Sequence, residues 1–239
     1  FDEFHERSLT ADLGLMLALE AQQALREDLK LLVMSATLET DLVARYLGNA
    51  AILECPGRGH PIHIEYCDAP PIRELPVAVA NTVAKALREL PVGDLLVFLP
   101  GRRDIERAIA ATLDRLSDRT VECLPLYGGL PLAQQALALT PSSESRRRVI
   151  FSTNIAETSL TILGVVGVVD AGWERRSRYD PNSDMTRLET TRISKASAAQ
   201  RAGRAGRLGP GYCWRLWPES VQQQMDDHQP AEIVDADLT

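Results

Sequence analysis

The sequence of 239 residues lacks the features of secreted, membrane-spanning and zinc-binding proteins. Its four cysteines are widely spaced and form no Cys-x-x-Cys pair, which favours reduced thiols in a cytoplasmic protein over disulfides or a zinc site. No apolar run approaches the ~18 residues of a membrane span, and no signal peptide is recognisable. We therefore expect a soluble globular protein with no membrane association.

The sequence has few lysines and lacks the lysine-containing phosphate-binding loop of many nucleotide-binding proteins. The only lysines are Lys30, Lys85 and Lys195, and none lies in a glycine-rich loop. Nothing in the chain matches Gly-x-x-x-x-Gly-Lys-Ser/Thr, whose backbone N–H groups cradle phosphates. The 239 residues alone are therefore predicted to bind nucleotide poorly and to hydrolyse essentially none.

Negative charge dominates the chain but not its carboxyl-terminal third. The net charge of −7 argues by itself against a nucleic-acid partner. Between Glu174 and Arg215, however, ten basic residues face four acidic ones, a local charge of +6. A basic stripe on an acidic body is the electrostatic footprint of a protein that binds phosphate groups.

The centre of this basic region is the octet Gln200 to Arg207, which reads Gln-Arg-Ala-Gly-Arg-Ala-Gly-Arg. The segment from Ile193 to Gly211 is predicted to be a short helix, capped by Ser194 or Ser197. Residues three apart are neighbours on a helix surface, so the octet predicts one arginine stripe and one side-chain-free lane. The stripe is Arg201, Arg204 and Arg207, and the lane is Gly203 and Gly206.

Guanidinium groups at this spacing suit a triphosphate, because an arginine fork binds phosphate oxygens bidentately and keeps its charge. The alternative is a basic face that is solvated or touches a nucleic-acid backbone. Two glycines inside a helix cost about 1 kcal/mol each relative to alanine, which disfavours a merely solvated helix.

Helices and strands alternate along most of the chain, which predicts an α/β fold with parallel sheets. Pro70-Pro71 is predicted to be a hinge. Strands are expected at 29–34, 51–55, 62–67, 94–99, 121–126, 148–152 and 165–169, with an edge strand at 212–217. Helices are expected at 8–28, 39–47, 72–90, 102–116 and 131–139, and a polar hairpin at 173–193.

Ligands of open parallel sheets bind beyond the carboxyl ends of the strands. Five polar segments follow predicted strands in this way: Asp2-Glu3, Ser35 to Thr37, Pro100-Gly101, Ser152 to Asn154 and Asp170 to Gly172. Adjacent carboxylates after a buried strand suit Mg²⁺ binding and the orientation of an attacking water, although solvated charge is the alternative for Asp2 and Glu3. His60 and His63 are expected to belong to a solvated loop, with metal binding the minor alternative.

Four of these segments and the octet Gln200 to Arg207, in order, resemble motifs II to VI of the DEAH-box helicases of superfamily 2. The matching residues are Asp2-Glu3-Phe4-His5, Ser35-Ala36-Thr37, Phe98-Leu99-Pro100-Gly101, Ser152 to Ser159 and Gln200 to Arg207. The run Phe1 to Leu9 and the preference for arginine over lysine are most similar to the bacterial HrpB branch of that family.

The resemblance implies two RecA-like parallel-sheet lobes, the first incomplete and the second with an inserted β-hairpin. Residues 1–69 would be the carboxyl-terminal part of the first lobe and residues 70–218 the second. Residues 219–239 would lead into a further domain. We therefore expect a fragment of a longer protein, with the phosphate-cradling loop before Phe1 and winged-helix and ratchet-like domains after Thr239.

The resemblance also implies a role for individual residues. Asp2 would hold Mg²⁺ and Glu3 would activate the hydrolytic water, while Ser35 and Thr37 would couple hydrolysis to lobe movement. Gln200 would lie near the γ-phosphate, and Arg204 and Arg207 would be arginine fingers. The residues that would face the nucleotide are Ser159, Asp170 and Trp173, the last stacking on the base or only supporting the hairpin. Those that would contact the nucleic-acid backbone are Gly101, Arg102, Thr153 and Asn154.

The function implied is an ATP-dependent RNA helicase that accepts other NTPs, requires Mg²⁺ and moves along single-stranded RNA or a duplex with an overhang. Two alternatives remain: a nucleic-acid-binding module without enzymatic activity, and a motor whose track is DNA. A purely structural α/β domain leaves the ordered motifs unexplained. The sequence identifies no protein partner.

Overall fold

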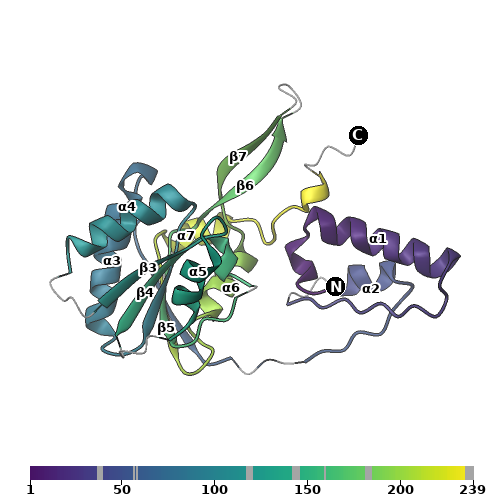
Figure 1. The fold of residues 1–239 in the computed structure, drawn as a ribbon, viewed down its shortest axis with the longest axis horizontal. Coiled ribbons are helices and arrows are strands. Elements are labelled where there is room, and N and C mark those ends of the chain that lie inside the picture. The colour runs from purple at the N-terminus through teal and green to yellow at the C-terminus, as the bar shows by residue number, and fades with distance from the viewer. Residues whose placement is uncertain are drawn as a thin grey trace. The chain divides into compact units, whose positions relative to one another are not determined.

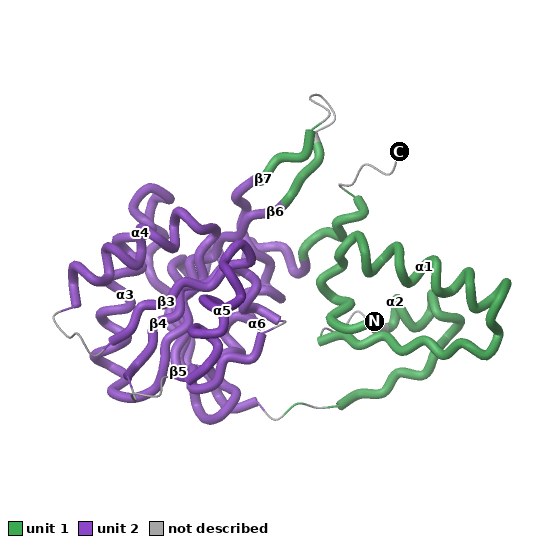
Figure 2. The backbone as a smooth tube through the Cα atoms, in the orientation of Figure 1, with its two compact units in different colours: residues 1–57, 177–188, 229–239 green, residues 58–176, 189–228 purple. Residues whose placement is uncertain are grey.

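The computed structural model describes residues 1–36, 40–55, 57, 59–116, 121–141, 146–158, 160–180 and 185–234. The chain forms two compact units, which Figure 2 distinguishes by colour. The smaller unit comprises residues 1–57, 177–188 and 229–239, and the larger comprises residues 58–176 and 189–228.

A six-stranded sheet forms the centre of the larger unit (Figure 1), and its strand order is β1-β8-β5-β2-β4-β3. All five pairings between its neighbouring strands are parallel, which confirms the predicted α/β class. The strands are β1 (Ile62–Tyr66), β2 (Asp94–Phe98), β3 (Val121–Leu126), β4 (Arg147–Ser152), β5 (Val165–Asp170) and β8 (Gly211–Arg215).

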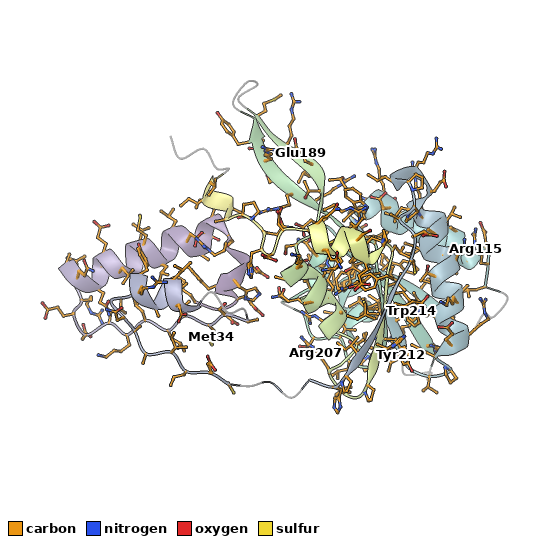
Figure 3. All side chains as sticks on the ribbon, turned by 180° about the vertical axis from the view of Figure 1, so that it is seen from behind. Met34, Arg115, Glu189, Arg207, Tyr212 and Trp214 are labelled. Atoms are coloured by element: carbon orange, nitrogen blue, oxygen red, sulfur yellow. The ribbon has the colours of Figure 1, made fainter. Side chains whose placement is uncertain are left out.

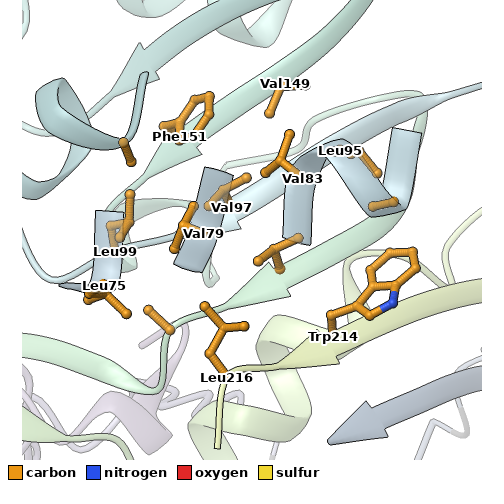
Figure 4. Packing of buried hydrophobic residues seen from close by; sticks show 14 of the residues in the cluster. Leu75, Val79, Val83, Leu95, Val97, Leu99, Val149, Phe151, Trp214 and Leu216 are labelled. Atoms are coloured by element: carbon orange, nitrogen blue, oxygen red, sulfur yellow. The ribbon is translucent and has the colours of Figure 1, made fainter. Parts of the chain in front are cut away.

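Helices cover both faces of the sheet, so the central strands are apolar on both sides. In β2 every residue is buried: Leu95 and Val97 pack with one cluster and Leu96 and Phe98 with the other. Figure 4 shows the first cluster, to which α3 (Leu75–Glu89) and α4 (Arg102–Leu113) contribute. The second cluster includes residues of α5 (Leu132–Leu139) and α6 (Lys195–Gly203). Each fully buried large side chain contributes roughly 1.5–3 kcal/mol.

The strand predicted at 212–217 exists, but its predicted position in the sheet is wrong. We expected residues 212–217 to form an edge strand, but β8 lies between β5 and β1. The edge position belongs to β1, whose Ile62 is in register with Gly211 of β8. This strand precedes the Pro70-Pro71 segment and lies within residues 1–69, which we expected to belong to the first lobe. Its hydrogen-bonding partner is nevertheless in the larger unit.

The polar hairpin is confirmed as a separate two-stranded sheet of β6 (Trp173–Asp180) and β7 (Met185–Arg192). The remaining short elements of the chain are η1 (Phe4–Glu6), η2 (Ile72–Glu74), η3 (Asn154–Ala156), α7 (Glu219–Gln224) and η4 (Glu232–Val234).

The smaller unit contains α1 (Leu9–Ala24) and α2 (Thr40–Tyr46). Ser8 caps α1 by accepting a hydrogen bond from Ala11 N, as expected for a serine before an apolar helix. The strands expected at 29–34 and 51–55 are not strands, because none of these residues joins a sheet ladder. Residues 32–34 instead bond locally to the start of the chain: Met34 N donates to Phe1 O at 2.8 Å, and Phe4 N donates to Met34 O at 3.0 Å.

Candidate functional site

The carboxyl ends of the central strands bring three of the predicted polar segments to one edge of the sheet. Phe98 at the end of β2 is in register with Ser152 of β4 on one side and with Asp170 of β5 on the other. The backbone continues this pairing, because Leu99 N donates to Ser152 O at 2.8 Å and Ala171 N donates to Phe98 O at 3.2 Å. Gly101, Thr153 and Asp170 therefore follow three adjacent strands.

Helix α6 contains only the first half of the arginine octet, because it ends at Gly203, well before the predicted end at Gly211. Ser194 caps its start, with its side chain accepting from Ser197 N at 3.1 Å. Because the helix stops, the expected continuous arginine stripe is wrong. Arg201 is 1% exposed and Arg204 is 5% exposed, whereas Arg207 lies beyond the helix and is exposed (Figure 3).

The two octet glycines also differ. A Cβ on Gly206 would lie 2.9 Å from the carbonyl oxygen of His60, whose N–H donates to Gly206 O at 3.0 Å. A Cβ on Gly203 would meet nothing within 4 Å. Of the two glycines in the predicted side-chain-free lane, Gly206 is therefore the one that another backbone segment approaches closely, the segment that leads into β1.

Arg201 is surrounded by carboxylates from three segments. Its guanidinium lies 2.8 Å from Glu157 Oε2, 3.1 Å from Asp170 Oδ1 and 3.5 Å from Glu174 Oε2. It also donates to Trp173 O at 3.3 Å and lies over the ring of Phe98. Arg201 therefore ties the loop after β4, the end of β5 and the start of β6 together.

The burial of these charges shifts their pKa values. Burial raises the pKa of Asp170, which is fully enclosed, despite the opposing attraction of Arg201. Burial likewise raises the pKa of Glu174, with a further rise from the charge of Glu157. Burial alone would lower the pKa of Arg201, but the charges of Glu157 and Asp170 outweigh it and raise this pKa. The cluster thus keeps its arginine charged.

Arg204 and Arg207 contact the same loop after β4. Arg204 donates from Nε to Glu157 O at 2.7 Å and from its terminal nitrogen to Leu160 O at 2.6 Å. Arg207 reaches Thr161 Oγ1 at 3.5 Å. Arginines at the end of α6 therefore hold Glu157, Leu160 and Thr161. Ser159, which was expected to face a nucleotide, lies outside the described residues.

The other residues expected at the nucleotide lie on α6 and at the start of the hairpin. Gln200 is half-buried on α6. Trp173 is half-buried at the start of β6, and the guanidinium of Arg192 lies 3.9 Å from its ring centroid. This cation–π contact supports the hairpin, which was the alternative role considered for Trp173.

Residues expected to bind nucleic acid follow β2 and β4. Gly101 is the N-cap of α4 and is buried, while Arg102 is exposed and donates to Glu106 Oε1 at 2.7 Å. Thr153 is half-buried and Asn154 is exposed. These groups form a polar surface at the same edge of the sheet as the Arg201 cluster.

In the smaller unit, His5 connects two of the predicted segments. Its Nδ1 accepts from Ala36 N at 3.1 Å, and its Nε2 lies 3.4 Å from Glu3 Oε2. Asp2 is exposed and its Oδ1 accepts from Glu3 N at 2.9 Å. Ser35 is exposed beside Ala36, and Thr37 lies outside the described residues. His5 thus connects the acidic pair with the serine segment.

The oxygen donors of this pair fit Mg²⁺, which prefers one or two carboxylates and several waters. The described part of the chain holds no group of three or more histidine, cysteine, aspartate or glutamate side chains suited to a metal ion. His60 and His63 therefore belong to no such group. No helix within the described ranges is long and apolar enough to cross a membrane.

Four residues of the site had no role assigned from the sequence: His5, Glu157, Glu174 and Arg175. Glu157 lies within the segment that resembles motif V, and that position could have drawn attention to it. No sequence signal indicated that Glu174 and Arg201 would be neighbours, because 26 residues, including most of the hairpin, separate them.

The parallel sheet and the arginine-bearing helix that follows the hairpin define the carboxyl-terminal lobe of a helicase. Residues 78–209, more than half of the chain, match the family described as the helicase conserved C-terminal domain, and the chain belongs to this family. The expected resemblance to DEAH-box helicases is confirmed by its relatives. The chain is 45% identical over 238 residues to the ATP-dependent RNA helicase HrpB of Escherichia coli (strain K12), covering 100% of this chain and 29% of that protein.

Two solved structures are similar to the whole chain. The crystal structure of the Escherichia coli DEAH/RHA helicase HrpB matches with a TM-score of 0.91 and 45% identity, covering 99% of this chain and 30% of that one. The crystal structure of the E. coli DExH-box NTPase HrpB matches with a TM-score of 0.89 and 45% identity, covering 99% and 29%. The chain therefore spans less than a third of the length of these relatives.

Proposed function

We propose that this chain is part of an NTP-dependent RNA helicase, in which ATP is bound and hydrolysed between two lobes that move along single-stranded RNA. The observation that supports it best is the end of α6. Arg204 donates to the carbonyl oxygens of Glu157 and Leu160, and Arg207 beyond it is exposed. An exposed arginine at this position is available to a phosphate group.

In this proposal the first lobe contributes Asp2 and Glu3, and the second contributes Arg204 and Arg207. Asp2 would hold Mg²⁺, which neutralises phosphate charge when it is bound. Glu3 would orient the attacking water, and its carboxylate is already positioned beside His5. Nucleotide favours the closed arrangement because only that arrangement pairs both sets of residues with its phosphates.

RNA would lie along Gly101, Arg102, Thr153 and Asn154, where backbone contacts position a strand without reading its sequence. Ser35 and Thr37 would couple hydrolysis to movement between the lobes. The name of the similar protein HrpB, an ATP-dependent RNA helicase, supports ATP as the nucleotide and RNA as the track.

The test is hydrolysis of ATP by the full-length protein with and without single-stranded RNA. We expect RNA to stimulate hydrolysis in the wild type and Glu3→Gln to abolish it. Glu54→Gln is the matched control, because Glu54 is an exposed carboxylate of the same unit with no assigned role. A protein that binds RNA but shows no stimulated hydrolysis would instead be a non-catalytic binding module.

A further inference from the structure

Arg175 lies directly against Gly101, a contact that the sequence did not indicate. A Cβ built on Gly101 would lie 3.0 Å from both Cζ and Nε of Arg175 and 3.2 Å from its Cδ. The guanidinium therefore occupies the space that any other side chain at position 101 would fill. Arg175 belongs to β6, which follows β5, whereas Gly101 follows β2.

Glycine at position 101 is explained by this space and not by backbone conformation. Its φ of −167° and ψ of 174° are extended values that any residue adopts. Gly101 is also buried, because the Arg175 side chain covers it. A strand of RNA that reached this point would therefore meet the guanidinium before it met the glycine backbone.

Among the described residues, the guanidinium of Arg175 has no acidic partner. Arg175 is exposed, and its side chain makes no hydrogen bond or ion pair with any residue in the described part of the chain. Arg102 differs, because it donates to Glu106 at 2.7 Å and lies over the ring of Tyr127. Of these two cations, Arg175 is the one whose donors are all available to a ligand.

The neighbours of Arg175 belong to the surface that the proposed function assigns to RNA. Strand β2 lies between β5 and β4, so Gly101 is adjacent to Thr153 and Asn154 at the ends of neighbouring strands. By lying on Gly101, Arg175 extends from the end of β5 onto this surface. Its charge is thereby held beside groups that would contact a nucleic-acid backbone.

We propose that Arg175 binds a backbone phosphate of single-stranded RNA. In place of the direct RNA contact first expected of it, Gly101 would act by making room for the Arg175 side chain. This inference rests on the proposed function, because it assigns one contact within the RNA surface. A guanidinium is suited to this contact, since it binds phosphate oxygens bidentately.

The experiment is a double-mutant cycle in the full-length protein, read by the anisotropy of a short fluorescent oligouridylate. The variants are Arg175→Ala, Gly101→Ala and the double variant. Gly101→Ala is a mild change, because the atoms that its Cβ would meet are the far end of a flexible side chain. Arg88→Ala is the matched control: Arg88 is exposed at the end of α3, at the opposite edge of the sheet.

We expect Arg175→Ala to weaken RNA binding about tenfold, as for the loss of one charge-assisted contact. The slope of log Kd against log salt should fall by about 0.7, the value for one phosphate of a single strand. Gly101→Ala should weaken binding to a similar extent, and the double variant should be no weaker than Arg175→Ala alone. Arg88→Ala should bind as the wild type does.

Three results would overturn the inference. If Arg175→Ala binds RNA like the wild type, Arg175 is not a contact. If the losses from the two single variants multiply, Gly101 meets RNA independently and does not act through Arg175. If the salt slope is unchanged, the contact is not to a phosphate. Failure of the wild type itself to bind RNA would overturn the proposed function together with this inference, and so is distinguishable from all three.

Discussion

The guanidinium of Arg201 lies 2.8 Å from the carboxylate of Glu157, and only 1% of the Arg201 side chain is exposed to solvent. The octet therefore holds arginines with different tasks. Arg201 is a structural member that joins Glu157, Asp170 and Glu174, whereas Arg207 is exposed. Arg204 is intermediate in its interactions, because it is buried and donates to two backbone carbonyl oxygens.

Replacement of Arg201 should destabilise the larger unit more than any exposed arginine does. Arg201→Met should lower the free energy of unfolding by about 3–5 kcal/mol, because buried carboxylates lose their partner. Urea unfolding followed by tryptophan fluorescence is the measurement, since all three tryptophans, Trp173, Trp214 and Trp217, belong to the larger unit. Arg207→Met is the control and should unfold as the wild type does. Equal stabilities of Arg201→Met and wild type would contradict the assignment.

The raised pKa of Glu174 predicts a pH-dependent effect of Glu174→Gln. Because the folded-state pKa lies above the ordinary value of 4.5, the folded protein holds more protons than the unfolded chain in the window between them. This carboxyl group therefore lowers the free energy of unfolding of the protein as pH rises from 4.5 to the folded pKa. Thermal unfolding of both proteins should show Glu174→Gln gaining stability relative to wild type across this window and a constant difference above it. A difference that shrinks with rising pH would refute this.

The two octet glycines should respond to alanine in opposite ways. Gly206→Ala should be destabilising, because its Cβ would lie 2.9 Å from the backbone oxygen of His60 and displace the segment leading into β1. Gly203→Ala should be neutral or stabilising by up to about 1 kcal/mol, since its Cβ meets nothing within 4 Å at the end of a helix. Denaturant unfolding of the pair measures both effects. Equal effects of the two substitutions would show that the close approach at Gly206 is unimportant.

Much of the larger unit is predictable because its strands are short apolar runs between polar turns. Residues 94–98 and 165–170 illustrate this. Each strand is buried on both faces, and its nearly continuous run of apolar residues predicts that burial. Pairing was not predictable for β8. Its neighbour β1 lies almost 150 residues earlier in the chain, and periodicity identifies a strand without identifying its partner.

The candidate site was predictable in position but not in detail. The carboxyl ends of β2, β4 and β5 follow from the alternation of strands and helices. The separate environments of Arg201 and Arg207 do not, because residue spacing indicates a shared face only while a helix continues, and α6 ends at Gly203. The enclosure of Arg201 also depends on carboxylates from three distant segments, which only the folded chain brings together.

The most direct test of the central claim, that arginines at the end of α6 act on a bound triphosphate, is the turnover number of Arg207→Ala in the full-length protein. ATP hydrolysis would be measured at saturating RNA beside Arg88→Ala. Because Arg207 is exposed and has one described contact, at 3.5 Å to Thr161, its loss should leave thermal stability unchanged. The account predicts a fall in turnover of about 10³- to 10⁵-fold, as for arginine fingers in general. A turnover number within about twofold of wild type would contradict it.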